Sequence, residues 1–105
     1  MEAFDEASLE LANAWLDPEV EAAFDQHGVI ILRDQKITPE QQVTFSGRFG
    51  ECAVNHNAAD FGIDGSPEIY LISNIVEDGR FIGTPKAGPE WHTDMSYAKV
   101  PARAT

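Results

Sequence analysis

Basic residues are scarce in this 105-residue sequence, and their shortage argues against whole classes of partner. Seven Lys and Arg residues stand against eighteen Asp and Glu residues, which gives a formal charge of -11. A field of this sign repels phosphate backbones and anionic lipid headgroups, so we expect neither nucleic-acid nor membrane binding. Many of the acids precede Arg33, the first basic residue, and such a cluster is typical of a solvated face.

Cysteine and long apolar runs are also nearly absent. The single Cys52 excludes an internal disulfide, and the N-terminus has neither the basic start nor the apolar run of a secretory signal, so we expect a cytoplasmic protein. The apolar run Val29–Leu32 is far shorter than the roughly 20 residues that cross a bilayer. Cys52 and His56 lack the third, orienting group that a thiolate nucleophile and its base require, which disfavours cysteine hydrolase chemistry.

What the sequence does contain is typical of a folded protein. Hydrophobic residues make up 43% of the chain, and its length fits one small domain spanning residues 1–105. Asp17-Pro18-Glu19 predicts a helix start, since Asp caps free amides and Pro suits the first helical position. We expect this helix over about residues 18–27, with Gly28 as its end. A weaker amphipathic pattern runs from Phe4 to Trp15.

The signal for a second helix start, at Thr38, is stronger than the one at Asp17. Thr38 and Gln41 form the pattern of a capping box, in which each side chain bonds the backbone amide of the other residue. The helix that follows carries an aromatic stripe, Phe45 and Phe49, and should end near Gly50. We expect this stripe to pack on a neighbouring strand as core.

Two short apolar runs, Val29–Leu32 and Ile69–Ser73, predict strands that are buried on both faces. Residues 51–67 are rich in Asn, Gly and Pro and predict a loop. Glu77–Arg80 predicts a hairpin turn, and a Gly- and Pro-bearing loop then leads to Trp91-His92-Thr93-Asp94. The predicted fold class is α+β.

His92 and Asp94 carry the most specific chemistry in the sequence. In a strand, residues two apart point to the same side, so an imidazole and a carboxylate would lie together. These are suitable ligands for divalent iron, which two histidines and one carboxylate can hold with positions left open for a co-substrate and oxygen. Taken alone, the pair is better explained by a histidine that orients a neighbouring carboxylate or caps a loop.

The order of the sequence blocks resembles the N-terminal portion of the taurine dioxygenase and 2,4-D dioxygenase (TauD/TfdA) family. The resemblance runs from about residue 28 to the end of the chain. The blocks that carry it are Gly28–Gln35, Ile37–Gln42, Phe45–Gly50, Pro67–Asn74, Asp78–Arg80 and Gly88–Tyr97, with Pro101 shortly after.

The resemblance implies an iron(II)- and 2-oxoglutarate-dependent dioxygenase that uses O2 to hydroxylate a small, anionic organic substrate. It makes His92 and Asp94 the first two metal ligands and the fold the opening helices and strands of a double-stranded β-helix (jelly-roll). The family's second histidine ligand and its 2-oxoglutarate-binding arginine lie well beyond the His-x-Asp block, so we expect the chain to be an N-terminal fragment. It would then act with a complementing C-terminal half or as a homo-oligomer.

Two further residues are candidates for the substrate pocket. His56 would contact an anionic substrate group or be a loop histidine without a ligand, and Asn74 would line the pocket or bond turn backbone. An alternative to catalysis also remains: a non-catalytic module that binds a partner through an open sheet edge.

Overall fold

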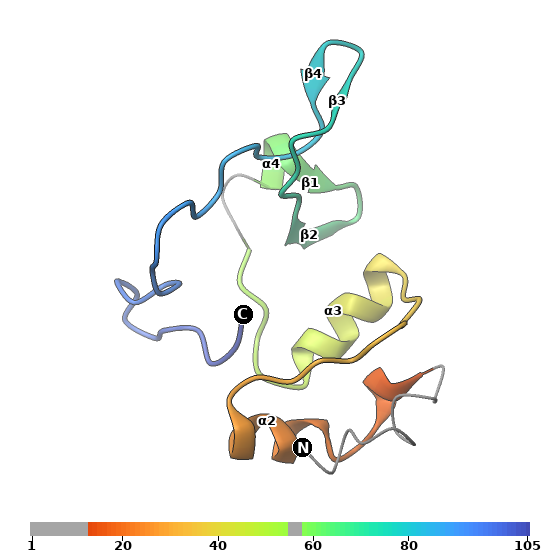
Figure 1. Ribbon diagram of the computed structural model, residues 1–105, viewed down its shortest axis with the longest axis vertical. Helices are drawn as coiled ribbons and strands as arrows, with labels where there is room; N and C mark the ends of the chain where they lie inside the picture. The colour runs from red at the N-terminus through yellow and green to blue at the C-terminus, as the bar shows by residue number, and fades with distance from the viewer. Residues whose placement is uncertain (1–12, 55–57) are drawn as a thin grey trace. The chain divides into compact units, whose positions relative to one another are not determined.

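The computed structural model describes residues 13–54 and 58–105. Two compact units, residues 1–49 and 50–105, divide the chain, and the expectation of one domain stays a prediction. Helices and short antiparallel strands give a mixed α+β structure, as predicted (Figure 1). Within the described residues, no helix has the length and apolar character required to span a membrane. The predicted pattern Phe4–Trp15 lies mostly outside the described residues.

The first unit begins with the 3-10 helix η2 (Ala14–Leu16) and the helix α2 (Val20–His27). Gly28 ends α2 as predicted, and its φ of 76° is the left-handed conformation that glycine adopts without strain. The helix begins at Val20, two residues later than expected. Asp17 still satisfies a free amide there, since its Oδ1 accepts a hydrogen bond of 2.8 Å from the backbone N–H of Glu19.

Helix α3 (Pro39–Gly47) starts with the predicted capping box. The amide of Gln41 donates to Thr38 Oγ1 over 3.2 Å, and the amide of Thr38 donates to Gln41 Oε1 over 2.8 Å. The helix ends at Gly47 with Arg48 as its C-cap, three residues before the expected end.

The core of this unit forms where α2 meets the aromatic stripe of α3. Val20 and Ala23 are almost fully buried. The Phe49 ring lies edge-on to the rings of Phe24 and Phe45, with centroids 5.3 and 5.5 Å apart. Partly buried side chains complete the cluster around Val20 and Ala23, namely Ile30, Leu32, Phe45 and Phe49. The stripe therefore belongs to the core, as predicted, although it packs against helix α2 instead of a strand.

The prediction of a strand at Val29–Leu32 is wrong. This segment belongs to no strand, and its side chains alternate: Ile30 and Leu32 pack on the helical core, whereas Val29 and Ile31 are 69% and 53% exposed. A strand buried on both faces needs hydrogen-bonded neighbours. The described residues place no partner strand beside this segment.

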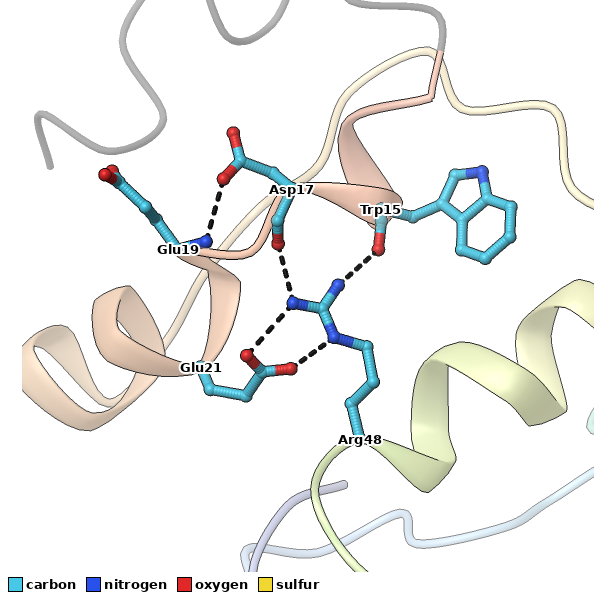
Figure 2. Close-up of polar contacts among 5 residues, drawn as sticks. All are labelled: Trp15, Asp17, Glu19, Glu21 and Arg48. Atoms are coloured by element: carbon cyan, nitrogen blue, oxygen red, sulfur yellow. Dashed lines mark hydrogen bonds and ion pairs between the residues drawn. The ribbon is translucent and has the colours of Figure 1, made fainter.

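Arg48 joins the end of α3 to the start of α2 (Figure 2). Its Nε donates to Glu21 Oε1, and its Nη2 donates to Glu21 Oε2 over 3.0 Å. The same guanidinium donates to the backbone carbonyls of Trp15 and Asp17 over 2.7 and 2.6 Å. One planar, always-charged group therefore satisfies four acceptors near the junction of η2 and α2.

The second unit contains a short helix and two hairpins. Helix α4 (Ala58–Phe61) leads into β1 (Gly62–Ile63), which pairs antiparallel with β2 (Ser66–Tyr70). The loop predicted for residues 51–67 is therefore wrong from residue 58 onward. The missed signal is Asp64-Gly65, since Gly65 turns the chain between β1 and β2 with a φ of 81°.

The strand predicted at Ile69–Ser73 exists but is shifted toward the N-terminus. It covers Ser66–Tyr70, and Ile69 is its one buried hydrophobic side chain. The predicted hairpin turn is confirmed: β3 (Val76–Glu77) pairs with β4 (Arg80–Phe81), with Glu77 opposite Arg80. Asp78 and Gly79 make this turn with φ values of 49° and 76°, the paired left-handed conformation of a tight hairpin.

A close backbone contact follows the β3–β4 hairpin. The amide of Thr84 donates to Leu71 O over 2.9 Å, and the amide of Ser73 donates to Thr84 O over 3.2 Å. The hydroxyls of Tyr70 and Thr84 also share a hydrogen bond. Gly83 is buried here, and a Cβ at this position would lie only 2.9 Å from Leu71 O and Ser73 N. This contact fixes the start of the loop that carries His92.

Candidate metal-binding site

His92 and Asp94 lie in an irregular segment rather than in the expected strand. Their side chains nevertheless meet: His92 Nε2 is 3.0 Å from Asp94 Oδ1. The two side chains are 51% and 42% exposed, so the pair faces solvent. The expected proximity is therefore present, although the predicted strand is not: the two groups meet in an irregular backbone segment.

The imidazole of His92 is held on its other side by its own chain. His92 Nδ1 lies 2.6 Å from the backbone carbonyl oxygen of Glu90. A carbonyl only accepts hydrogen bonds, so Nδ1 must carry the proton and donate it. This arrangement directs Nε2 toward Asp94, and a hollow beside the ring is lined by Gly88, Pro89, Glu90, Trp91 and His92.

These contacts raise the pKa of His92 above its ordinary value of 6.5. The hydrogen bond to the Glu90 carbonyl is the largest cause, and the negative charge of Asp94 is the next. Both ring nitrogens face acceptors, which favours the doubly protonated imidazolium. A divalent cation between the two residues would take the place of the proton on Nε2.

The pair fits two neighbouring ligands of a divalent metal. Imidazole nitrogen and carboxylate oxygen are compatible donors for iron(II). Donors at right angles on an ion with bonds of about 2.1 Å are about 3 Å apart, and His92 Nε2 and Asp94 Oδ1 have this separation. Across residues 13–54 and 58–105, no group of three or more His, Cys, Asp or Glu residues gathers around a common point, so no third donor of these types joins the pair there.

Of the other predicted site residues, only Asn74 lies in the part of the chain that the structure describes, and it does not join this pair. His56 lies outside the described residues. Asn74 is exposed in the segment between β2 and β3, and it is not among the residues that line the hollow beside His92. No signal in the sequence indicated that the Glu90 carbonyl contacts the His92 ring or that Gly88 lines the hollow beside it. Only the glycine itself was visible, as a loop residue four positions before His92.

The comparisons with known proteins identify a family for this chain. Residues 2–105 match the family described as "Taurine catabolism dioxygenase TauD, TfdA family". No solved structure matches the chain.

Three curated relatives illustrate the match. The chain is 29% identical over 98 residues to an (S)-phenoxypropionate/alpha-ketoglutarate-dioxygenase of Sphingobium herbicidovorans, covering 85% of this chain and 29% of that protein. It is 37% identical over 82 residues to pentalenolactone F synthase of Streptomyces arenae, covering 75% and 27%. It is 29% identical over 97 residues to an alpha-ketoglutarate-dependent 2,4-dichlorophenoxyacetate dioxygenase of a Burkholderia strain, covering 81% and 32%.

The chain matches no more than about a third of the length of each of these relatives. The family match, in contrast, covers nearly every residue of the chain, and it includes the His92 and Asp94 pair. The chain therefore belongs to the TauD/TfdA family of dioxygenases.

Proposed function

We propose that this chain supplies the first two iron ligands, His92 and Asp94, of an iron(II)- and 2-oxoglutarate-dependent dioxygenase. The supporting observation is the 3.0 Å approach of His92 Nε2 to Asp94 Oδ1 in a member of this family. In this proposal the strands of the second unit open a double-stranded β-helix. A second histidine and an arginine for 2-oxoglutarate come from sequence beyond Thr105 or from a companion chain.

The residues of this chain would then have distinct roles. His92 and Asp94 hold the metal through Nε2 and Oδ1, while the carbonyl of Glu90 keeps the proton on Nδ1 and so leaves Nε2 as the donor. When bound, iron(II) and 2-oxoglutarate supply the oxidising chemistry with O2, which no side chain can supply. The protein contributes ligand geometry, substrate orientation and exclusion of water.

The proposed substrate is a small organic anion. The relatives whose names state a substrate are named for phenoxypropionate and 2,4-dichlorophenoxyacetate, both of which carry a carboxylate. A chain with a formal charge of -11 needs a local cation or donor group to hold an anion. His56 and Asn74 remain the proposed contributors of such contacts.

Metal titration tests the proposed ligands directly. Calorimetric titration of manganese(II), a redox-stable substitute for iron(II), should show binding to the wild-type chain and loss of that binding in His92→Ala and in Asp94→Ala, since each variant lacks one of the two proposed ligands. His27→Ala is the matched control, because His27 is an exposed histidine at the end of α2 in the other unit. Equal binding by wild type and His92→Ala would remove the metal-site proposal.

The reaction needs its own assay. Wild-type protein that contains all three ligands, supplied with iron(II), 2-oxoglutarate and O2, should form succinate, whereas the His92→Ala protein should not. Substrate screening should begin with aryloxy carboxylates. Absence of succinate despite tight, His92-dependent metal binding would limit the claim to a metal site.

A second candidate function is a non-catalytic module that binds a partner through an open sheet edge. It is favoured by the β3–β4 hairpin, which has two strands and leaves Val76 and Phe81 about half exposed. This alternative predicts no succinate formation together with a defined complex or oligomer in solution, which analytical ultracentrifugation would detect.

A further inference from the structure

Gly88 lies directly against the ring of His92. A Cβ built on Gly88 would be 2.4 Å from His92 Cε1, 3.1 Å from Nε2 and 3.4 Å from Nδ1. Carbon atoms that are not bonded approach favourably at about 3.5–4.0 Å. The imidazole therefore occupies the space that a side chain at position 88 would take.

The backbone at Gly88 also has a φ of 57°, in the left-handed region. This conformation alone would disfavour a residue with a side chain, since L-residues other than glycine rarely adopt it. The same conformation occurs at Gly65 and Gly79 in this unit, where an added Cβ would meet no atom within 4 Å. Gly88 differs from them because the ring of His92, a proposed metal ligand, occupies the space where its Cβ would lie.

Displacement of the ring would break two contacts at once. The imidazole is fixed by Nδ1 donating to Glu90 O over 2.6 Å and by Nε2 approaching Asp94 Oδ1 at 3.0 Å. The ring is also half exposed, so solvent offers it an alternative position if it is pushed away. A methyl group at position 88 would therefore move Nε2 away from Asp94, although the side chains of both proposed ligands remain chemically unchanged.

We propose that Gly88 is a positioning residue for His92: its missing side chain provides the space in which the imidazole meets Asp94. This inference rests on the proposed function, because it assigns the meeting of the two groups to metal binding. It adds a residue four positions before the ligand to the set that determines metal affinity. Pairs of metal ligands depend on such supporting contacts for their orientation.

The test compares Gly88→Ala with Gly79→Ala, which introduces the same methyl group at a left-handed glycine with open space around it. Manganese(II) titration of the chain should show about a tenfold or greater loss of affinity for Gly88→Ala, and less than a twofold change for Gly79→Ala. Circular dichroism of both variants checks that the fold is retained. Gly88→Ala should cause no further loss in a His92→Ala background, since the ring through which it acts is then absent.

A metal-free measurement gives a second readout. In the wild-type chain, a nuclear Overhauser effect should connect the Hα of Gly88 with Hε1 of His92, and the ring ¹⁵N shifts should report a proton on Nδ1. In Gly88→Ala these shifts should move toward those of a solvent-exposed histidine, while in Gly79→Ala they should stay.

Two outcomes would overturn the inference and leave the proposed function standing. One is wild-type affinity and unchanged ring shifts in Gly88→Ala while His92→Ala loses the metal. The other is an equal loss of affinity in Gly88→Ala and Gly79→Ala, which would assign the effect to backbone strain alone. If instead wild type and His92→Ala bind manganese(II) equally, the proposed function fails, and the role of Gly88 in metal binding fails with it.

Discussion

Arg48 binds the carboxylate of Glu21 through two of its nitrogens, Nε and Nη2. Its Nη1 and Nη2 also donate to backbone carbonyls. Both side chains are more than two-thirds buried, so solvent screens the pair only in part. These contacts link the C-terminus of α3 to the N-terminus of α2 (Figure 2). Because lysine is a point charge without a planar fork, it cannot reproduce this arrangement.

We expect Arg48→Ala to destabilise the protein by about 2 kcal/mol, since it leaves part-buried charged and carbonyl acceptors without their donors. Arg48→Lys should cost about 1 kcal/mol, because it keeps the charge but loses the bidentate geometry. Urea unfolding measures both changes as shifts of the midpoint. The exposed Arg33→Lys serves as control and should leave the midpoint unchanged. Equal midpoints for wild type and Arg48→Lys would show that charge alone matters here.

Opposite effects are expected from the same substitution at two glycines. Gly83→Ala should destabilise the protein by about 1–3 kcal/mol, because its Cβ would overlap the backbone of Leu71 and Ser73 at 2.9 Å. Gly47→Ala lies at the end of α3 with nothing within 4 Å, so it should stabilise by up to about 1 kcal/mol through helix propensity. Thermal unfolding of the two variants checks the prediction. A stabilising Gly83→Ala would contradict the close backbone contact.

The capping box of α3 gives a third prediction. Thr38→Ala removes the acceptor of the Gln41 amide and should lower the free energy of unfolding by about 1 kcal/mol. Thr38→Ser retains the hydroxyl, so it should keep most of the free energy of unfolding that Thr38→Ala loses. Chemical denaturation followed by circular dichroism would separate the two variants, and an Ala variant as stable as the Ser variant would rule out a contribution from this cap.

Proton binding at His92 gives a fourth prediction. In the metal-free chain its NMR titration midpoint should lie above 6.5. Asp94→Asn should lower the midpoint without returning it fully to 6.5, because the larger cause, the Glu90 carbonyl, remains. A raised histidine pKa contributes stability that is present below pH 6.5 and is lost as the pH rises through the folded-state pKa. A midpoint at or below 6.5 in wild type would contradict the two contacts.

Local signals in the sequence predicted the parts of the structure that local chemistry determines. The capping box of Thr38 and Gln41, the Gly28 helix end and the Asp78-Gly79 turn all depend on residues within a few positions of one another. The strand at Val29–Leu32 was wrong because a strand depends on distant partners, and the described residues place none beside it.

The candidate site divides in the same way. The proximity of His92 and Asp94 was predictable because the two residues are only two positions apart in the sequence. The support from Gly88 and from the Glu90 carbonyl was not predictable, since it depends on backbone angles that residue types do not specify. His56 and Asn74 remain predictions, because a substrate pocket is assembled from segments far apart in a chain.

The contacts that hold His92 come from Gly88, Glu90 and Asp94, all within four positions of it. Closing so short a loop carries little entropic cost and takes nanoseconds rather than milliseconds. The proposed ligand pair, His92 and Asp94, can therefore form from contacts that are local in the sequence.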